Sequence, residues 1–168
     1  MTDFFFRSHV ENFLDIKEKC IDAITSMGTF SFKNKGQHIS NMDYHLGPDI
    51  SRPYAAIVRP IFEEHNKKVV KAIHPDASID IVNMWFQQYD TGDYHSIHTH
   101  PYVNFSNIFY LELESPTQST KFIKDQKEFI YPVEEGDILT FPGHIPHTSP
   151  YNNLGRKTTI VFNTNISM

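Results

Sequence analysis

Three histidines have the type and spacing that a metal-binding site requires. His98 and His100 are separated by one residue, and Pro101 follows them directly. In extended chain, residues two apart point to the same face, so both imidazoles would lie on one side of a strand. His147, much later in the sequence, could supply a third ligand and leave positions open on the metal, as catalytic sites do. Imidazole suits iron, zinc, copper or nickel, so the ligand type alone does not select the metal.

Other histidines nearby are weaker candidates for the same site. His95 lies three residues before His98, and this odd spacing predicts that its side chain points to the opposite face. His144 belongs to the loop that contains His147, and we expect a supporting role for it or none. The chain has ten histidines in 168 residues, so a close pair can also arise by chance, and such a pair often forms only the polar face of a strand.

Arg156 and Thr158 could form a socket for an anionic co-substrate beside the metal. Arg156 lies nine residues after His147, and its planar guanidinium matches the geometry of a carboxylate. Thr158 is two residues further along, so on a strand it shares the face of Arg156 and could add a hydroxyl donor. Taken alone, the arginine could equally be a surface residue and the threonine an ordinary strand former.

Short strands must position most of these side chains. Runs rich in β-branched and aromatic residues, separated by Gly, Pro and Asn turns, predict strands over residues 79–89, 105–113, 120–123, 128–131, 138–141 and 157–163. Five or six short strands that follow two helices predict a mainly β (α+β) fold, in which an antiparallel barrel or sandwich is backed by N-terminal helices.

The first half of the sequence has a helical pattern instead. Apolar residues at helical spacing predict a helix over residues 9–26, with Ser8 and Glu11 as a capping box at its start. A second helix is predicted over residues 60–73, opened or kinked by the proline at its first position. The polar segment 33–53 is interrupted by Gly and Pro, which predicts a long loop or lid with one short strand, and we expect it to carry substrate contacts.

The composition is typical of a single acidic, ordered domain. The length of 168 residues suits one domain, with helical support and a lid in 1–77 and the barrel in 78–168. The net charge of −5 argues against a nucleic-acid or membrane-surface partner. Cys20 is the only cysteine, which excludes an internal disulfide. The N-terminal stretch 1–7 is too briefly apolar for a signal peptide, so we expect a cytoplasmic protein.

The order of these features resembles that of the Fe(II)/2-oxoglutarate-dependent oxygenase superfamily. The likeness is greatest to its prolyl-hydroxylase-like branch and to small bacterial and phage members with a His-x-His-Pro motif, which leaves a phage origin open. The matching features span residues 80–165, about half of the chain. They are His98-Thr99-His100, Tyr110-Leu111, Gly136, Phe141, His147 and Arg156-Lys157-Thr158.

The resemblance implies a double-stranded β-helix, which is a jelly-roll or cupin-like barrel, with Fe(II) at its open end. It also implies hydroxylation of an unknown small-molecule, peptide or protein substrate by O2, while 2-oxoglutarate is decarboxylated to succinate. The implied metal ligands are His98, His100 and His147, and the implied 2-oxoglutarate contacts are Arg156, Tyr110 and Thr158. Five further residues could line the pocket, although ordinary packing is their more common role: Trp85, Gln87, Ser106, Asn107 and Asn163.

His100 departs from the family pattern, because the family usually has Asp or Glu at this position. Three neutral ligands would leave the metal site one charge more positive. Either His100 binds the metal, or water or a carboxylate such as Asp93 does so in its place, or the oxygenase activity has been lost. We favour the first. Two other classes stay open. One is a cupin-like three-histidine metalloenzyme that uses no 2-oxoglutarate, and the other is a non-catalytic barrel with a binding or structural role.

Overall fold

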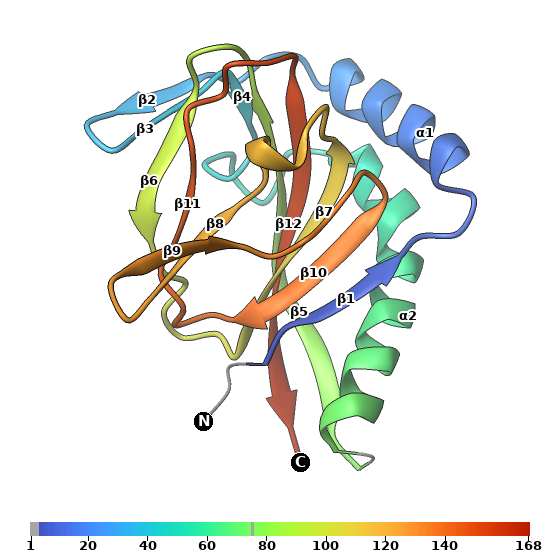
Figure 1. The fold of residues 1–168 in the computed structure, drawn as a ribbon. Helices are drawn as coiled ribbons and strands as arrows, with labels where there is room; N and C mark the ends of the chain where they lie inside the picture. Colours follow the sequence, from blue (N-terminus) through green and yellow to red (C-terminus); the bar gives the residue numbers. More distant parts are fainter. Residues whose placement is uncertain (1–3, 75) are drawn as a thin grey trace.

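The computed structural model describes residues 4–74 and 76–168 of the chain. Residues 1–3, on which part of the expectation about a signal peptide falls, lie outside the described residues, as does Pro75. The described part contains two six-stranded antiparallel sheets and two α-helices (Figure 1). This architecture confirms the prediction of a mainly β protein with two helices.

The first sheet has the strand order β1-β10-β7-β12-β5-β4. Its strands are β1 (Phe6–His9), β4 (Asn41–Met42), β5 (Ser78–Tyr89), β7 (Phe105–Glu112), β10 (Asp137–Pro142) and β12 (Lys157–Ser167). The long strands β5 and β12 pair along their whole length, with one register shift after Asn163. This pairing gives the sheet its central axis, and the site residues of β5 and β12 are therefore fixed relative to each other.

Alternation along β12 assigns its side chains to two different environments. Ile160 and Phe162 join a buried cluster with the two helices. Lys157, Thr159 and Val161 point instead towards the second sheet, where they line an internal cavity. Because the strand period is two, a shift of one residue exchanges these two environments completely.

The second sheet has the strand order β2-β3-β6-β11-β8-β9. Its strands are β2 (Phe32–Asn34), β3 (Gln37–Ile39), β6 (Tyr94–His98), β8 (Lys121–Lys124), β9 (Lys127–Ile130) and β11 (His147–Ser149). A short 3-10 helix, η1 (Pro116–Gln118), leads into β8. One buried cluster contains Ile39 and Phe122 from this sheet together with Trp85 and Val161 from the first. The two sheets therefore face each other across a shared core.

One short link connects the two sheets near their common edge. Strand β3 pairs with β6 of the second sheet, and β4 pairs with β5 of the first. Only Ser40 separates β3 from β4, and its backbone N–H donates to the carboxylate of Asp93 at 2.8 Å. The chain therefore crosses from one sheet to the other within a single, anchored residue. The predicted loop 33–53 thus contains most of three short strands.

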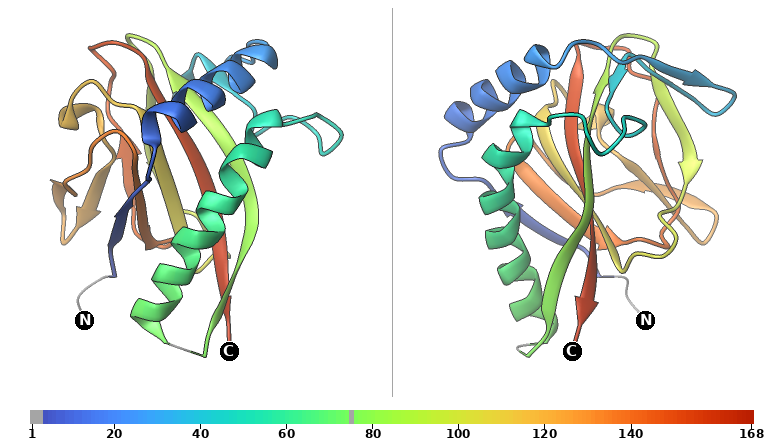
Figure 2. Two further views of the ribbon diagram at one scale, coloured as in Figure 1. Left: turned by 90° about the vertical axis from the view of Figure 1, so that its right-hand side faces the viewer. Right: turned by 180° about the vertical axis from the view of Figure 1, so that it is seen from behind.

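The two helices, α1 (Phe13–Ser26) and α2 (Pro53–Ile73), lie on the same side of the molecule (Figure 2). Their buried residues share a core cluster with the outward-facing residues of β5, β7, β10 and β12. The ring of Phe62 stacks on that of Phe162, with 3.9 Å between the centroids. The helices therefore cover the face of the first sheet that points away from the second sheet.

Both helices begin at different residues from those predicted. The first begins at Phe13 rather than at residue 9, because residues 6–9 pair with β10 as strand β1. The Ser8 hydroxyl is consequently no cap, and it lies 2.6 Å from Nδ1 of His65. The second helix begins seven residues earlier than predicted, at Pro53, which occupies the first turn, where proline is favoured.

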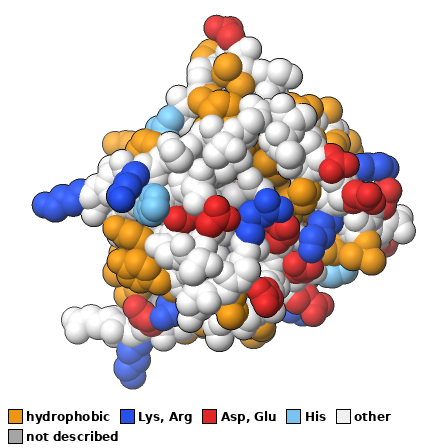
Figure 3. Space-filling model, turned by 90° about the horizontal axis from the view of Figure 1, so that it is seen from above, with side chains coloured by type: hydrophobic (Ala, Val, Ile, Leu, Met, Phe, Trp, Pro, Cys, Tyr) orange, Lys and Arg blue, Asp and Glu red, His pale blue; other side chains and the backbone are white. Residues whose placement is uncertain are grey.

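The surface carries charges of both signs. Acidic and basic side chains alternate over the face seen from above (Figure 3). No helix in residues 4–74 or 76–168 is long and apolar enough to cross a membrane.

Candidate metal centre

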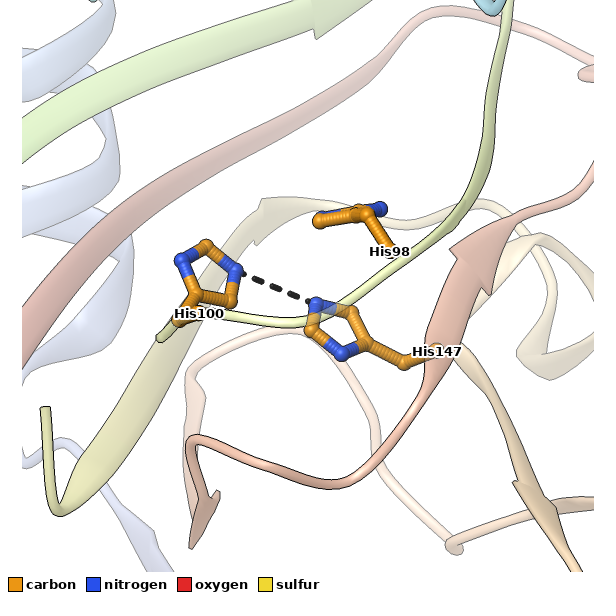
Figure 4. Close-up of side chains that lie close together, drawn as sticks. All are labelled: His98, His100 and His147. Carbon is orange, nitrogen blue, oxygen red and sulfur yellow. Dashed lines mark hydrogen bonds between the residues drawn. The ribbon is translucent and has the colours of Figure 1, made fainter. Parts of the chain in front are cut away.

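The structure brings His98, His100 and His147 together between the two sheets (Figure 4). One nitrogen of each ring lies within 4.8 Å of the corresponding nitrogen of the other two. Nε2 of His100 and Nε2 of His147 are 3.2 Å apart. Three side chains predicted from the sequence as metal ligands therefore converge on one point.

Backbone pairing explains this convergence. His98, the last residue of β6, lies directly opposite His147, the first residue of β11. The chain after β6 is held by a hydrogen bond from the His100 N–H to the Gly143 carbonyl at 2.8 Å. A Cβ at Gly143 would lie 2.8 Å from the carbonyl oxygens of both His100 and Val103. Only glycine allows this close approach, so Gly143 sets where His100 enters the site.

The protonation of two rings is set by backbone carbonyls. Nδ1 of His98 lies 2.8 Å from the Ser96 carbonyl, and Nδ1 of His147 lies 2.9 Å from the Ile145 carbonyl. A carbonyl only accepts hydrogen bonds, so each Nδ1 carries the proton and each Nε2 keeps a free lone pair. Such lone pairs are the atoms that a divalent metal needs.

Burial keeps these histidines neutral. It lowers the pKa of His147 to about 2, and the nearby His98 adds to the effect. Burial also lowers the pKa of His100 to about 4 and lowers that of His98. Neutral imidazoles do not repel a cation, so the donor set fits a divalent transition metal.

No carboxylate joins this group among the residues that the structure describes. Asp93, the sequence candidate for such a ligand, is buried elsewhere. Its carboxylate accepts hydrogen bonds from the backbone N–H groups of Ser40 at 2.8 Å and Asp90 at 2.9 Å. His144 is exposed and lies outside the group.

The prediction that His95 points away from His98 is wrong. Their rings stack with 3.8 Å between centroids and 15° between planes. His147 and Ser149 of β11 are two residues apart, yet they pair with His98 and His95, which are three apart. This β-bulge in β6 cancels the alternation on which the prediction rested, so both side chains reach the same face.

Lys157 is a buried cation in the cavity behind the histidines. Its Nζ donates to the Gln118 carbonyl at 3.0 Å and to the Ser149 hydroxyl at 2.5 Å, and lies 4.3 Å from the centroid of the Tyr89 ring. Burial lowers the pKa of Lys157 to about 7. Its contacts in the described part of the chain include no carboxylate. A buried ammonium group without a counter-ion is costly, and this environment fits an anionic ligand.

The structure does not bring Arg156 or Thr158 to that cavity, which corrects the predicted socket. Nε and Nη2 of Arg156 donate to the two carboxylate oxygens of Glu112, each at 2.9 Å, and the side chain is 42% exposed. Thr158 donates its hydroxyl proton to Glu112 as well. The reason is the register of β12. Its odd-numbered residues Lys157, Thr159 and Val161 line the cavity, so the neighbours of Lys157 point away from it. The sequence placed the socket one residue away from the side chain that reaches the cavity.

Tyr110 lies one layer behind the same cavity. It is fully buried, and its hydroxyl donates to Oγ1 of Thr120 at 3.1 Å. Thr120 itself lines the cavity. Burial raises the pKa of Tyr110 to about 12, so the phenol stays protonated. Tyr110 therefore lies on the inward face of β7 but does not line the cavity, because Thr120 lies between its hydroxyl and that space.

An outer groove opens on the other side of the histidines. Its lining residues include the aromatic side chains of Tyr44, Trp85 and Tyr102 and the amides of Asn83 and Asn163. No Asp, Glu, Lys or Arg belongs to this lining in the described residues. The segment 33–53 contributes Gln37, Met42, Tyr44 and His45 to this lining, and a substrate contact there stays a prediction. The groove is the open approach to the histidine group.

The suggested pocket residues divide between the two spaces. Trp85 and Gln87 line both, Ser106 lines the inner cavity and Asn163 lines the outer groove. Asn107 faces the helix side instead, where its Oδ1 accepts from Thr140 at 2.5 Å. Oγ of Ser106 and Oδ1 of Asn163 are buried without a hydrogen-bond partner among the described residues.

Comparison with known proteins gives a result at the level of structure only. No family model matches the sequence, and no curated protein matches it. Solved structures do match, and one is an oxidoreductase of the 2OG-Fe(II) oxygenase family from Burkholderia pseudomallei. It has 11% sequence identity and a TM-score of 0.65, and the match covers 98% of this chain and 95% of that one.

Two prolyl hydroxylases are also similar in structure. The viral collagen prolyl hydroxylase of Paramecium bursaria Chlorella virus-1, solved with 2OG, has 11% identity and a TM-score of 0.65, with coverage of 96% and 95%. A Trichoplax adhaerens prolyl hydroxylase, solved with a peptide fragment of the hypoxia inducible factor oxygen degradation domain, has 12% identity and a TM-score of 0.68, with coverage of 96% and 84%. The resemblance predicted from the sequence is confirmed, and the chain has the fold of the 2OG-Fe(II) oxygenases.

Proposed function

We propose that this protein is an Fe(II)- and 2-oxoglutarate-dependent oxygenase that hydroxylates its substrate. His98, His100 and His147 would hold the metal, and Lys157 would hold the distal carboxylate of 2-oxoglutarate in place of Arg156. One observation carries the proposal. The buried ammonium group of Lys157, which contacts no carboxylate among the described residues, shares a cavity with three neutral histidines. A divalent metal would bind the histidine nitrogens, and a dicarboxylate would place one carboxylate beside the Lys157 ammonium group.

Charge supports the choice of a dianionic co-substrate. The three histidines add no negative charge to a divalent metal, and Lys157 adds a positive one when it is protonated. A carboxylate near Lys157 favours its charged form and raises its pKa again, so co-substrate binding and protonation strengthen each other. Ser149 and Gln118 already orient the ammonium group. Tyr110 and Thr120 would complete the wall behind the carboxylate.

When bound, iron and 2-oxoglutarate supply the oxidising chemistry that hydroxylates a substrate C–H bond with O2 and releases succinate and CO2. The chain itself positions the reactants and excludes water. The inner cavity is narrow and enclosed by the aromatic residues Trp85 and Tyr89. The substrate would approach through the outer groove, whose lining carries no formal charge. This lining favours an uncharged part of a small molecule or peptide.

The arrangement of the elements belongs to the same proposal. We propose that residues 78–168 form a double-stranded β-helix and that residues 1–77 support it and contribute the rim of the groove. The shared core between α1, α2 and the first sheet supports one folding unit over residues 1–168.

Anaerobic addition of Fe(II) and 2-oxoglutarate to the full chain tests the proposal. A visible metal-to-ligand charge-transfer band is expected, and it should disappear in His147→Ala and in Lys157→Met. Arg156→Met is the matched control, because it removes the neighbouring cation at the surface and should keep the band. Iron-loaded, folded protein without this band, and without succinate formation, would contradict the proposal.

The all-histidine donor set favours a second candidate, a three-histidine metalloenzyme that uses no 2-oxoglutarate. In that case Lys157 would bind an anionic substrate or product. The two candidates differ in one measurement. A metal-dependent activity that needs no 2-oxoglutarate, is insensitive to its addition and falls in Lys157→Met supports the second candidate over the first.

A further inference from the structure

A chain of hydrogen bonds through the metal centre determines where each ring proton lies. His147 donates from Nδ1 to the Ile145 carbonyl, so its Nε2 can only accept. The partner of that Nε2 is Nε2 of His100, 3.2 Å away. The proton between them therefore belongs to His100. In the metal-free site, His100 carries its proton on Nε2, the atom that faces the other two histidines.

Asn163 ends this chain. With its proton on Nε2, His100 has a lone pair on Nδ1, and the side-chain amide of Asn163 lies 3.4 Å from that nitrogen, with Nδ2 as donor. Nδ1 of His98 and Nδ1 of His147 are both fixed by backbone carbonyls. Only His100 relies on a side chain, and only His100 has the opposite tautomer.

Binding of a metal at Nε2 of His100 would require the opposite arrangement. The proton has to move to Nδ1, and Nδ1 then needs an acceptor. The NH2 group of Asn163 cannot accept, but its Oδ1 can. That oxygen is buried without a partner among the described residues, in a side chain that is 4% exposed. A half-turn of the amide places Oδ1 where Nδ2 lies.

We propose that Asn163 is a positioning residue that serves both tautomers of His100. Its NH2 group donates to the metal-free ring, and its oxygen accepts from the metal-bound ring. The inference rests on the proposed metal role of His100. A carboxylate ligand at position 100 would have no second ring nitrogen and would need no such partner. The role of Asn163 therefore depends on the presence of a histidine at position 100. Asn163 lies on the same face of β12 as Lys157, Thr159 and Val161, so its side chain points towards the site.

The tautomers can be read directly in the full-length, 15N-labelled protein by long-range 1H–15N spectra. Without metal, His98 and His147 should carry the proton on Nδ1, whereas His100 should carry it on Nε2. Addition of Zn2+, a diamagnetic probe, should move the His100 proton to Nδ1 and leave the other two rings unchanged.

Two substitutions separate positioning from packing. Asn163→Asp keeps only accepting oxygens, so His100 should have its proton on Nδ1 before metal is added, and Zn2+ affinity should be at least that of the wild type. Asn163→Leu has the same size and neither function, and Zn2+ affinity should fall about 10- to 100-fold. Asn83→Leu is the matched control, because Asn83 lies opposite Asn163 on β5 and lines the same groove. It should leave affinity and tautomers unchanged.

Two results would overturn the inference: an Nδ1 proton on His100 in the metal-free wild type, or wild-type Zn2+ affinity in folded Asn163→Leu. If Asn163→Leu does not fold, the tautomer in Asn163→Asp decides. None of these measurements includes 2-oxoglutarate. If Zn2+ changes the tautomer but the separate experiment with Fe(II) and 2-oxoglutarate gives no charge-transfer band, the oxygenase function is refuted and the role of Asn163 stands. A wild type that binds no Zn2+ refutes both proposals.

Discussion

The Lys157→Met variant should be more stable than the wild type at neutral pH and should bind 2-oxoglutarate poorly. Methionine has a similar length and fills the same space without a charge. Among residues 4–74 and 76–168, the buried ammonium group of Lys157 has two hydrogen-bond partners, Ser149 and Gln118. Removing its charge therefore removes a cost of folding and, at the same time, the anchor for the co-substrate.

The size of the folding cost follows from the pKa. Burial lowers the pKa of Lys157 from 10.5 to about 7, which corresponds to at most about 5 kcal/mol of unfolding free energy. The variant gains less than this limit, because methionine also loses the hydrogen bonds of the ammonium group. For the co-substrate, leaving one member of a buried charge pair alone costs about 3–5 kcal/mol. That cost corresponds to a fall in affinity of about 100-fold or more.

The pH dependence has a definite sign. The folded-state pKa of Lys157 lies below the unfolded value, so between pH 7 and pH 10.5 the unfolded chain binds the extra proton. The unfolding free energy of the wild type therefore rises with pH through that window. Below about pH 7 both states are charged and the full cost remains. The advantage of the methionine variant should be largest at pH 7 or below and should vanish towards pH 10.5.

Urea unfolding at pH 6.5 and 9.5, followed by the fluorescence of the single tryptophan, measures this difference. Adding metal and 2-oxoglutarate should reverse the order of stability at pH 6.5, because only the wild type gains binding energy. Arg156→Met is the control and should show neither effect. The reasoning is refuted if Lys157→Met is less stable by the same amount at both pH values, or if it keeps wild-type affinity for 2-oxoglutarate.

Three further predictions concern the metal centre and its surroundings. Gly143→Ala should lower metal affinity at least about 10-fold in a folded protein, measured by Zn2+ titration, because its Cβ would displace the backbone of His100. Metal affinity should fall only below pH 6.5, since burial lowers the pKa of all three histidines from that ordinary value; calorimetry at several pH values checks this. Arg156→Ala should change the unfolding free energy by no more than about 1 kcal/mol, because its pair with Glu112 lies at the surface, and chemical denaturation measures it.

The grouping of three histidines was predictable in part, because two of them are close in the sequence. His98 and His100 are separated by one residue, and the distal His147 follows a strand that the composition already indicated. The three residues converge as predicted. The mainly β fold was predictable for a similar reason, since short aromatic and β-branched runs between turn residues have few other stable arrangements.

The side chain that places a cation in the inner cavity was not predictable, because it depends on strand register. Arg156, Lys157 and Thr158 are consecutive, and the register of β12 against β5 and β7 decides which of them points inward. The preference of guanidinium for carboxylates favoured Arg156, but Glu112 already occupies it. The position of His95 depends on a bulge of the same kind. A pattern with period two is reliable only where the strand is regular.

Long-range pairing also overruled a local helix signal. Ser8 and Glu11 have the spacing of a capping box, yet residues 6–9 pair with β10. The hydroxyl that would have capped the helix bonds to His65 of α2 instead. Propensity cannot predict this outcome, because the competing partner is more than 120 residues away in sequence, at positions 137–140.

The single-residue crossing at Ser40 has a consequence for how the protein could change. Because β3 and β4 belong to different sheets and Gln37 and Met42 of these strands line the groove, the one-residue link between them limits how far the two sheets can separate there. His98 and His147 lie at the paired ends of β6 and β11, and His100 follows β6. A longer link would let the outer groove widen while the distances within the histidine group stay the same. Substrate size could then evolve, or be engineered, separately from the chemistry.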